Sequence, residues 1–306
     1  AQLQRRCICL LMIFLAKLEV GVVPLIMRAI AKEFGVSLEF AAWTRFAPDY
    51  VMVMTAPIIS KVADMCGHEV IWRLGSLLLL ASTWIAAWSP TFYVLVLARG
   101  CIGIAQSCVI SPGLAIMAKD LPPSSRGLMA SYMVTSITLG SSVGLLSGGI
   151  ALDYIGWRWT FLIPAPVMSL LWLTSFIIIQ EGKTEDNDIG KGKAKCSKGK
   201  GRGKNDEVDE IGTADAESSK GKGKGKRGKS SSKPALLADF DWKGSLLFSL
   251  ASFCLLFALN RGDDLGWGSP TIALAAIGGV LLIPVLIYVE YRHENRVLAL
   301  DIFFEK

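Results

Sequence analysis

The stretch GSSVGLLSGG, residues 140–149, lies inside a long apolar segment and carries glycine at Gly140, Gly144 and Gly148. In water, each glycine in a helix interior costs roughly 1 kcal/mol relative to alanine. In a lipid bilayer, helices associate through close packing, and glycine at every fourth position forms a smooth stripe on which a neighbouring backbone can pack. The stretch therefore predicts a membrane helix with a closely packed partner.

Apolar segments of similar length recur along the 306 residues, which are 52% hydrophobic and have a mean hydropathy of +0.46. About 20 apolar residues cross a ~30 Å hydrocarbon core as a helix. The sequence therefore predicts an all-α, multi-pass integral membrane protein. The expected spans are residues 7–31, 43–63, 70–89, 91–118, 127–151, 158–180, 243–260 and 270–290.

The positive charges of the short loops predict the orientation in the membrane. Lysine and arginine in short loops stay in the cytoplasm. If the spans alternate in direction, the N-terminus is cytoplasmic, and the plasma membrane is the expected location. The residues that fall on the cytoplasmic side are Arg5, Arg6, Lys61, Arg73, Lys119, Arg126, Arg292 and Arg296.

Residues 181–240 differ in composition from the rest of the chain. They hold 15 of the 32 lysines and arginines and few large apolar residues, so they cannot bury enough surface to fold. We expect a disordered, basic cytoplasmic loop between a six-helix bundle (1–180) and two further helices with a cytoplasmic end (241–306). GKGKRGKS, residues 223–230, matches a phosphate-loop pattern, but no strand or helix flanks it. Neither nucleotide nor specific nucleic-acid binding is expected.

Cysteine and histidine give no indication of a metal site, a cofactor or an enzyme. The seven cysteines are scattered, without a C-x-x-C spacing or a neighbouring histidine, so neither a metal site nor a disulfide framework is predicted. His68 and His293 lie at the ends of spans. An intramembrane serine protease would therefore have no histidine to activate its serine.

Several stretches resemble the signatures of the major facilitator superfamily. SKVADMCGHEV (60–70) is similar to its loop signature G-x-L-x-D-R-x-G-R-R, with Asp64 and Gly67 matching, and ARGCIGIAQS (98–107) is similar to R-x-x-x-G, with Arg99. The opening stretch resembles the antiporter signature G-x-x-x-G-P-x-x-G-G. The positions that match that signature are Gly140, Gly144, Gly148 and Gly149. The resemblance implies a six-helix bundle and a gating loop at Asp64 and Gly67.

The end of the chain resembles helices 7 and 8 of the fourteen-helix drug:proton antiporter branch, in the segment from DFDWKGSLLFSL to VEYRHENRVLALDIF. This resemblance implies that a second six-helix half is missing, so we expect a fragment or a truncated gene model. Without that half, the glycine stripe is expected to face lipid or to mediate self-association with another copy of the chain.

Glu19 is the strongest candidate for a functional charge. LEVGVVPLIM resembles the family's L-D-x-T-I-V-N-x-A-L, in which Glu19 replaces a membrane-embedded aspartate. At 1.5 Å per residue, Glu19 lies about 18 Å from the cytoplasmic start of its helix and Arg99 about 12 Å from the outer start of its own, which gives both the same depth. Loss of water favours a protonated carboxyl group and an approaching arginine favours the ionised one, so proton coupling is predicted. A permanent structural pair of Glu19 with Arg99 or with Lys17 is the alternative.

The predicted function is secondary active transport of a small organic or amphipathic solute, as proton-coupled efflux. The alternative is a non-transporting scaffold or partner subunit with a basic interaction loop. Arg45 and Asp49 are four residues apart, hence on one helix face, and are predicted to form a local pair near the outer membrane surface.

Overall fold

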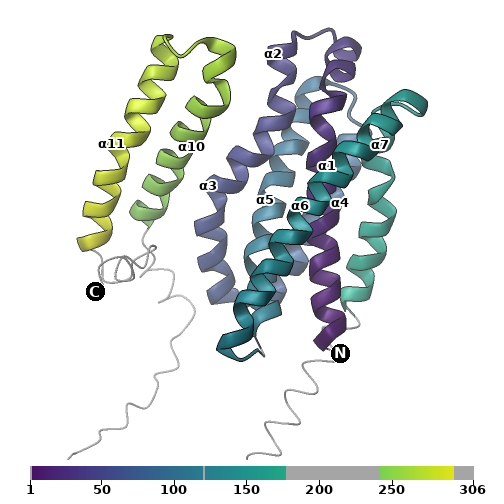
Figure 1. Cartoon of the computed structure of the whole chain (residues 1–306), viewed down its shortest axis with the longest axis vertical. Helices are drawn as coiled ribbons and strands as arrows, with labels where there is room; N and C mark the ends of the chain where they lie inside the picture. The colour runs from purple at the N-terminus through teal and green to yellow at the C-terminus, as the bar shows by residue number, and fades with distance from the viewer. Residues whose placement is uncertain (1, 120, 177–241, 293–306) are drawn as a thin grey trace, which may run out of the picture.

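The structure is a computed structural model that describes residues 2–119, 121–176 and 242–292 (Figure 1). The predicted loop 181–240 and the end of the chain after residue 292 lie outside the described residues. Every regular element in the described part is a helix, so the predicted all-α class is confirmed. The helices are α1 (Gln2–Phe34), α2 (Leu38–Ala41), α3 (Trp43–Cys66), α4 (His68–Ala87), α5 (Phe92–Ala118), α6 (Pro123–Tyr154), α7 (Trp159–Leu162, with helix continuing over 164–176), α10 (Trp242–Leu265) and α11 (Pro270–Arg292).

Seven helical segments in the described residues are long and apolar enough to cross a membrane. They are α1, α4, α5, α6, Trp159–Phe176, α10 and α11. The eighth expected span, residues 43–63, is helix α3, which has 24 residues and would extend about 36 Å. It is not among the seven, because it carries the charged residues Arg45, Asp49, Lys61 and Asp64.

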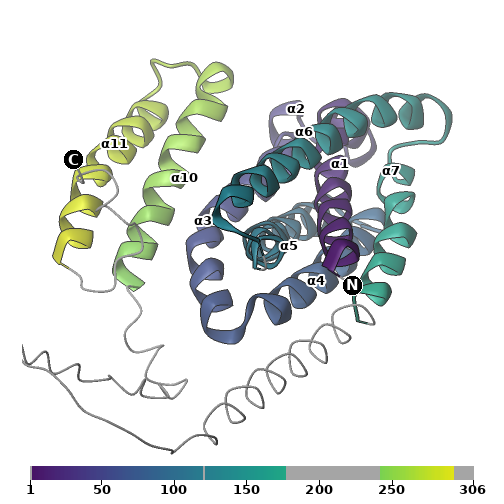
Figure 2. The same ribbon diagram turned by 60° about the horizontal axis from the view of Figure 1, so that its bottom comes forward.

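Helix α1 lies in the middle of the bundle, packed along α6 and against α5, and α5 also packs against α3 and α4 (Figures 1 and 2). The buried apolar residues form two main clusters. One contains Cys9 to Ala16 of α1 and one contains Val22 to Ile30 of the same helix. The polar residues Lys17 and Glu19 therefore lie between two apolar layers.

The glycine stripe of α6 packs on α1. A Cβ atom at Gly140 or Gly144 would overlap a carbonyl oxygen of α1, and one at Gly148 would lie 2.9 Å from Val22 Cγ1. Gly149 has more room, since its Cβ would lie 3.7 Å from Leu25 Cδ1. The expectation that this stripe faces lipid or a second copy of the chain is wrong, because α1 of the same chain already covers it.

Two further sets of contacts fix the ends and the side of the bundle. Arg158 Nη2 donates to Glu33 Oε1 at 2.8 Å, and its Nη1 donates to the carbonyl oxygens of Ala87 and Ser89, which joins the ends of α1 and α4 to the start of α7. Helices α10 and α11 form a hairpin that packs on α3. There Ser249 donates to the carbonyl oxygen of Met54 at 2.6 Å.

We predict that Gly144→Ala lowers the stability of the bundle, while Gly149→Ala does not. The first change forces a methyl group onto the carbonyl oxygen of Leu18, and overpacking of this kind costs typically ~1–3 kcal/mol. The second has space and gains the helix propensity of alanine. Detergent-induced unfolding of the two variants is the measurement. Equal midpoints for both variants would contradict the packing role of the stripe.

Candidate functional site

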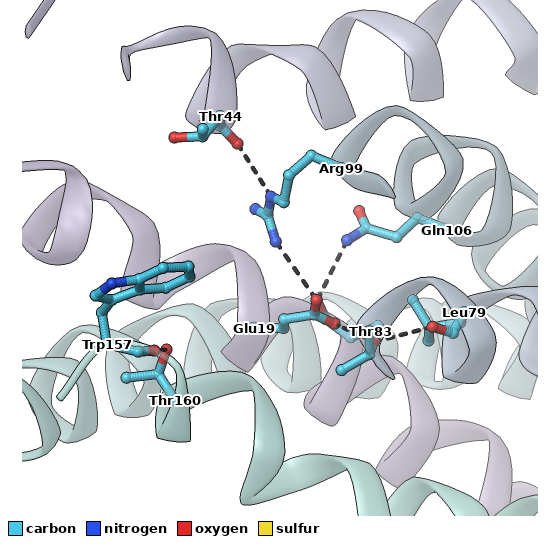
Figure 3. Close-up of polar contacts among 9 residues, drawn as sticks. Glu19, Thr44, Leu79, Thr83, Arg99, Gln106, Trp157 and Thr160 are labelled. Carbon is cyan, nitrogen blue, oxygen red and sulfur yellow. Dashed lines mark hydrogen bonds and ion pairs between the residues drawn. The ribbon is translucent and has the colours of Figure 1, made fainter. Parts of the chain in front are cut away.

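Glu19 of α1 is completely buried, and two other helices hold its carboxylate (Figure 3). The Thr83 hydroxyl of α4 lies 2.9 Å from Glu19 Oε2 and equally far from the carbonyl oxygen of Leu79, so it can donate to either. Arg99 Nη1 of α5 lies 3.4 Å from Glu19 Oε1. Residues 80 positions apart in the chain thus form an ion pair in the interior of the bundle.

Arg99 is also completely buried and connects four helices. Its Nε donates to the carbonyl oxygen of Thr44 on α3 at 3.0 Å, and Figure 3 shows the guanidinium between this oxygen and Glu19. The guanidinium carbon lies 5.6 Å from the ring centre of Phe161, which belongs to α7. Its Nη2 is buried and makes no hydrogen bond. The arginine therefore retains one unused donor group.

The pair is buried but loose. Charge-assisted N–H···O bonds are usually about 2.7–2.9 Å long, whereas Arg99 and Glu19 are 3.4 Å apart. Burial favours the neutral form of a carboxylic acid, and a neighbouring guanidinium favours the anion. A carboxylate in this position can therefore exchange a proton when the distance to the arginine changes.

Lys17 has other partners than the predicted one. Its Nζ donates to Gln106 Oε1 at 2.9 Å and lies 3.7 Å from the sulfur of Met52. Gln106 Nε2 donates in turn to the carbonyl oxygen of Ala16. The alternative of a Glu19–Lys17 pair is therefore wrong. The two residues have different partners, Glu19 on α4 and α5 and Lys17 on α3 and, two turns further along, α5.

Thr83 and Gln106 were not predicted from the sequence. Both are polar residues within apolar spans, and Gln106 lies seven residues, or two turns, after Arg99 on the same face of α5. A search for polar residues on the buried helix faces would have found them. The backbone carbonyl of Thr44 also had a signal in the sequence, because Pro48, four residues later in α3, has no N–H and leaves this carbonyl without its intrahelical donor.

The predicted pair of Arg45 and Asp49 is not formed. Arg45 is exposed, and its guanidinium lies 5.8 Å from the ring centre of Phe46. Asp49 is half-buried, and no cation of the described residues approaches its carboxylate within ion-pair distance. The interpretation as a local surface pair is therefore wrong.

Asp64 and Gly67 lie at the other end of α3 from Thr44, away from Glu19. Gly67 joins α3 to α4 with a φ of 97°, a conformation that favours glycine. His68 Nε2 lies 3.6 Å from Asp64 Oδ1. An open cavity of about 450 Å³ lies beside Asp64, between α3, α5 and α10. It is lined by Ala56, Pro57, Ser60, Lys61, Asp64, Ser111 and Phe248.

The structure thus brings together Glu19 and Arg99 and leaves the other predicted sites apart. The glycines of α6 lie on the flank of α1, where a Cβ at Gly140 would come within 3.2 Å of Lys17 Cβ. Asp64 and Gly67 form a separate junction. Among the described residues, no three histidine, cysteine, aspartate or glutamate side chains gather as a metal site.

The sequence of this chain is similar to one protein family and to several curated proteins. The sequence model of the family described as Major Facilitator Superfamily matches residues 9–299. Multidrug resistance protein 3 of Bacillus subtilis is 27% identical over 161 residues, which are 53% of this chain and 31% of that protein. Multidrug resistance protein B homolog of Mycobacterium tuberculosis is 25% identical over 56% of this chain and 32% of its own length.

A further relative aligns along nearly the whole sequence. Multidrug resistance protein Stp of Mycobacterium tuberculosis is 23% identical over 299 residues, which are 96% of this chain and 45% of that protein. The chain thus spans between about a third and a half of the length of these curated relatives.

We predict that Arg99→Met destabilises the bundle by about 3–5 kcal/mol, the usual cost of removing one partner of a buried ion pair. The double variant Glu19→Gln/Arg99→Met should be less destabilised, because neither charge of the pair then remains without the other. Detergent-induced unfolding of the single and double variants measures this, with exposed Arg45→Met as the control. Strictly additive losses would show that the two side chains do not act as a pair.

Proposed function

The chain belongs to the Major Facilitator Superfamily, and we propose that it serves in secondary active transport, exporting a small organic or amphipathic solute in exchange for protons. The observation that carries this proposal is the buried, loose ion pair of Glu19 and Arg99 inside a multi-pass membrane bundle. Ionisable residues in membrane spans are costly and are usually retained for function. The names of the relatives, which refer to multidrug resistance, support efflux as the direction.

The protonation of Glu19 is the proposed coupling step. A proton that binds to the Glu19 carboxylate removes its negative charge and therefore most of its attraction for Arg99. Arg99 contacts α1 through Glu19 and α3 through Thr44, so a weaker pair loosens α1 from α3 and α5. Loss of the proton restores the contact. Proton binding is in this way converted into a change in helix packing.

The remaining parts of the chain have proposed roles around this pair. Residues 1–180 form the transport bundle, 181–240 a cytoplasmic loop, and 241–306 two additional spans with a cytoplasmic end. Asp64 and Gly67 form the gating loop at the cytoplasmic end of α3. In transporters built from repeats, the solute site lies near the bilayer midplane at the repeat interface. The depth of Glu19 and Arg99 in the bundle agrees with such a site.

A carrier is a better proposal than a scaffold or an enzyme. The proteins that this chain resembles are named for resistance to drugs, and members of the superfamily are generally carriers that perform no chemical reaction on the solute. A fully buried ion pair is also costly in a membrane span, and a membrane scaffold does not need one. The solute and the proton are therefore the proposed partners, together with the lipid bilayer.

We predict that Glu19→Gln abolishes proton-driven transport without unfolding the protein, because glutamine keeps the shape of glutamate and carries no titratable proton. The measurement is export of the amphipathic dye ethidium, or of whichever dye of a panel the wild type exports. It uses inverted vesicles from cells that express the protein at the length its gene encodes. Exposed Glu39→Gln is the matched control and should transport normally. Normal proton-driven flux in Glu19→Gln would refute the coupling role.

We also predict that the end of the bundle at which α1 begins and α3 ends is cytoplasmic in the plasma membrane. In a variant that keeps Cys66, an exposed cysteine at that end, as its single thiol, a membrane-impermeant maleimide should label broken but not intact cells. Ser37→Cys in the cysteine-free background lies at the opposite end and should be labelled in intact cells. The reverse pattern would invert the proposed orientation.

A further inference from the structure

Asp49 is a half-buried carboxylate inside the bundle whose function none of the contacts above explains. It lies on α3, and among the described residues no cation is within ion-pair distance of it. Its negative charge nevertheless acts on two buried cations, Lys17 and Arg99. A partly buried carboxylate gains from a cation partner where the medium has low polarity.

The packing of α3 on α5 places Asp49 beside Arg99. Gly103 follows Arg99 by one turn of α5, and a Cβ atom there would lie only 3.0 Å from the Cα of Pro48, the residue before Asp49. Arg99 is already bound to α3 through the carbonyl oxygen of Thr44, five residues before Asp49. The arginine therefore lies against the segment of α3 from Thr44 to Pro48, next to the second carboxylate.

Arg99 has the capacity to bind a second acid. Its Nη2 is buried and makes no hydrogen bond, and its Nη1 is 3.4 Å from Glu19, longer than a strong ion pair. A guanidinium carries five N–H donors in a fixed planar fork. The unused nitrogen is therefore available to donate to a second carboxylate.

We propose that Asp49 is the alternate partner of Arg99, and that the guanidinium moves from Glu19 on α1 to Asp49 on α3 when Glu19 becomes neutral. This inference rests on the proposed function, since protonation of Glu19 is the event that releases the arginine. With Glu19 as its partner in one state and Asp49 in the other, the buried arginine has a carboxylate beside it in both states. It also gives the released arginine a defined second position, which makes the change in packing a switch between two states.

The test is a double-mutant cycle on stability, measured with the purified chain by detergent-induced unfolding. Asp49→Asn alone should have little effect, because Glu19 still holds Arg99. In the Glu19→Gln background, Asp49→Asn should shift the unfolding equilibrium about tenfold further than in the wild type, since Arg99 then lacks any carboxylate. Asp49→Glu should preserve the wild-type behaviour in both backgrounds. Exposed Asp153→Asn is the control and should show no dependence on Glu19.

The outcomes separate this inference from the proposed function. Additive effects of Glu19→Gln and Asp49→Asn would overturn the inference, even if Glu19→Gln abolishes transport. A coupling of Asp49→Asn to Lys17→Met instead of Glu19→Gln would also overturn it, because Asp49 would then be the partner of the lysine. A tenfold coupling together with normal transport by Glu19→Gln would support the second position of Arg99 and refute the proposed function.

Discussion

The bundle depends on one constraint: a charge inside a bilayer must have a partner, and the partner of Glu19 is Arg99. Both side chains are fully buried. The contacts of this pair reach α1, α3, α4, α5 and α7, through Thr83, the Thr44 carbonyl group and Phe161. Two apolar clusters lie above and below the pair, so a change of charge on either side chain weakens the link between these helices.

Glycine makes this arrangement possible by bringing backbones close together. At the α3–α5 crossing, Gly103 allows α5 to approach Pro48 of α3 so closely that a Cβ atom would not fit. This approach brings the Thr44 carbonyl oxygen within reach of Arg99. On the other side of α1, the stripe of α6 performs the same function with Gly140 and Gly144. The position of the buried charges therefore depends on the close helix packing that these glycines allow.

Most of the helices and the common level of Glu19 and Arg99 could be predicted from the sequence, because both follow from local properties. Span length follows from the hydrocarbon thickness, and the level of Glu19 and Arg99 follows from the helical rise. The partners of the side chains were less predictable. The glycine stripe, Lys17 and the Arg45–Asp49 pair were assigned partners that the structure does not show. Their true neighbours, such as Gln106 for Lys17, come from distant parts of the chain, and no periodicity within one helix specifies them.

The central claim is that Glu19 takes up and releases a proton inside the bundle. Infrared difference spectroscopy of the purified chain in lipid nanodiscs, recorded between acidic and alkaline pH, tests it most directly. The account predicts a band of a buried protonated carboxyl group that appears at acidic pH in the wild type and is absent in Glu19→Gln. An identical set of carboxyl bands in both proteins would contradict the account and leave Glu19 and Arg99 as a permanent structural pair.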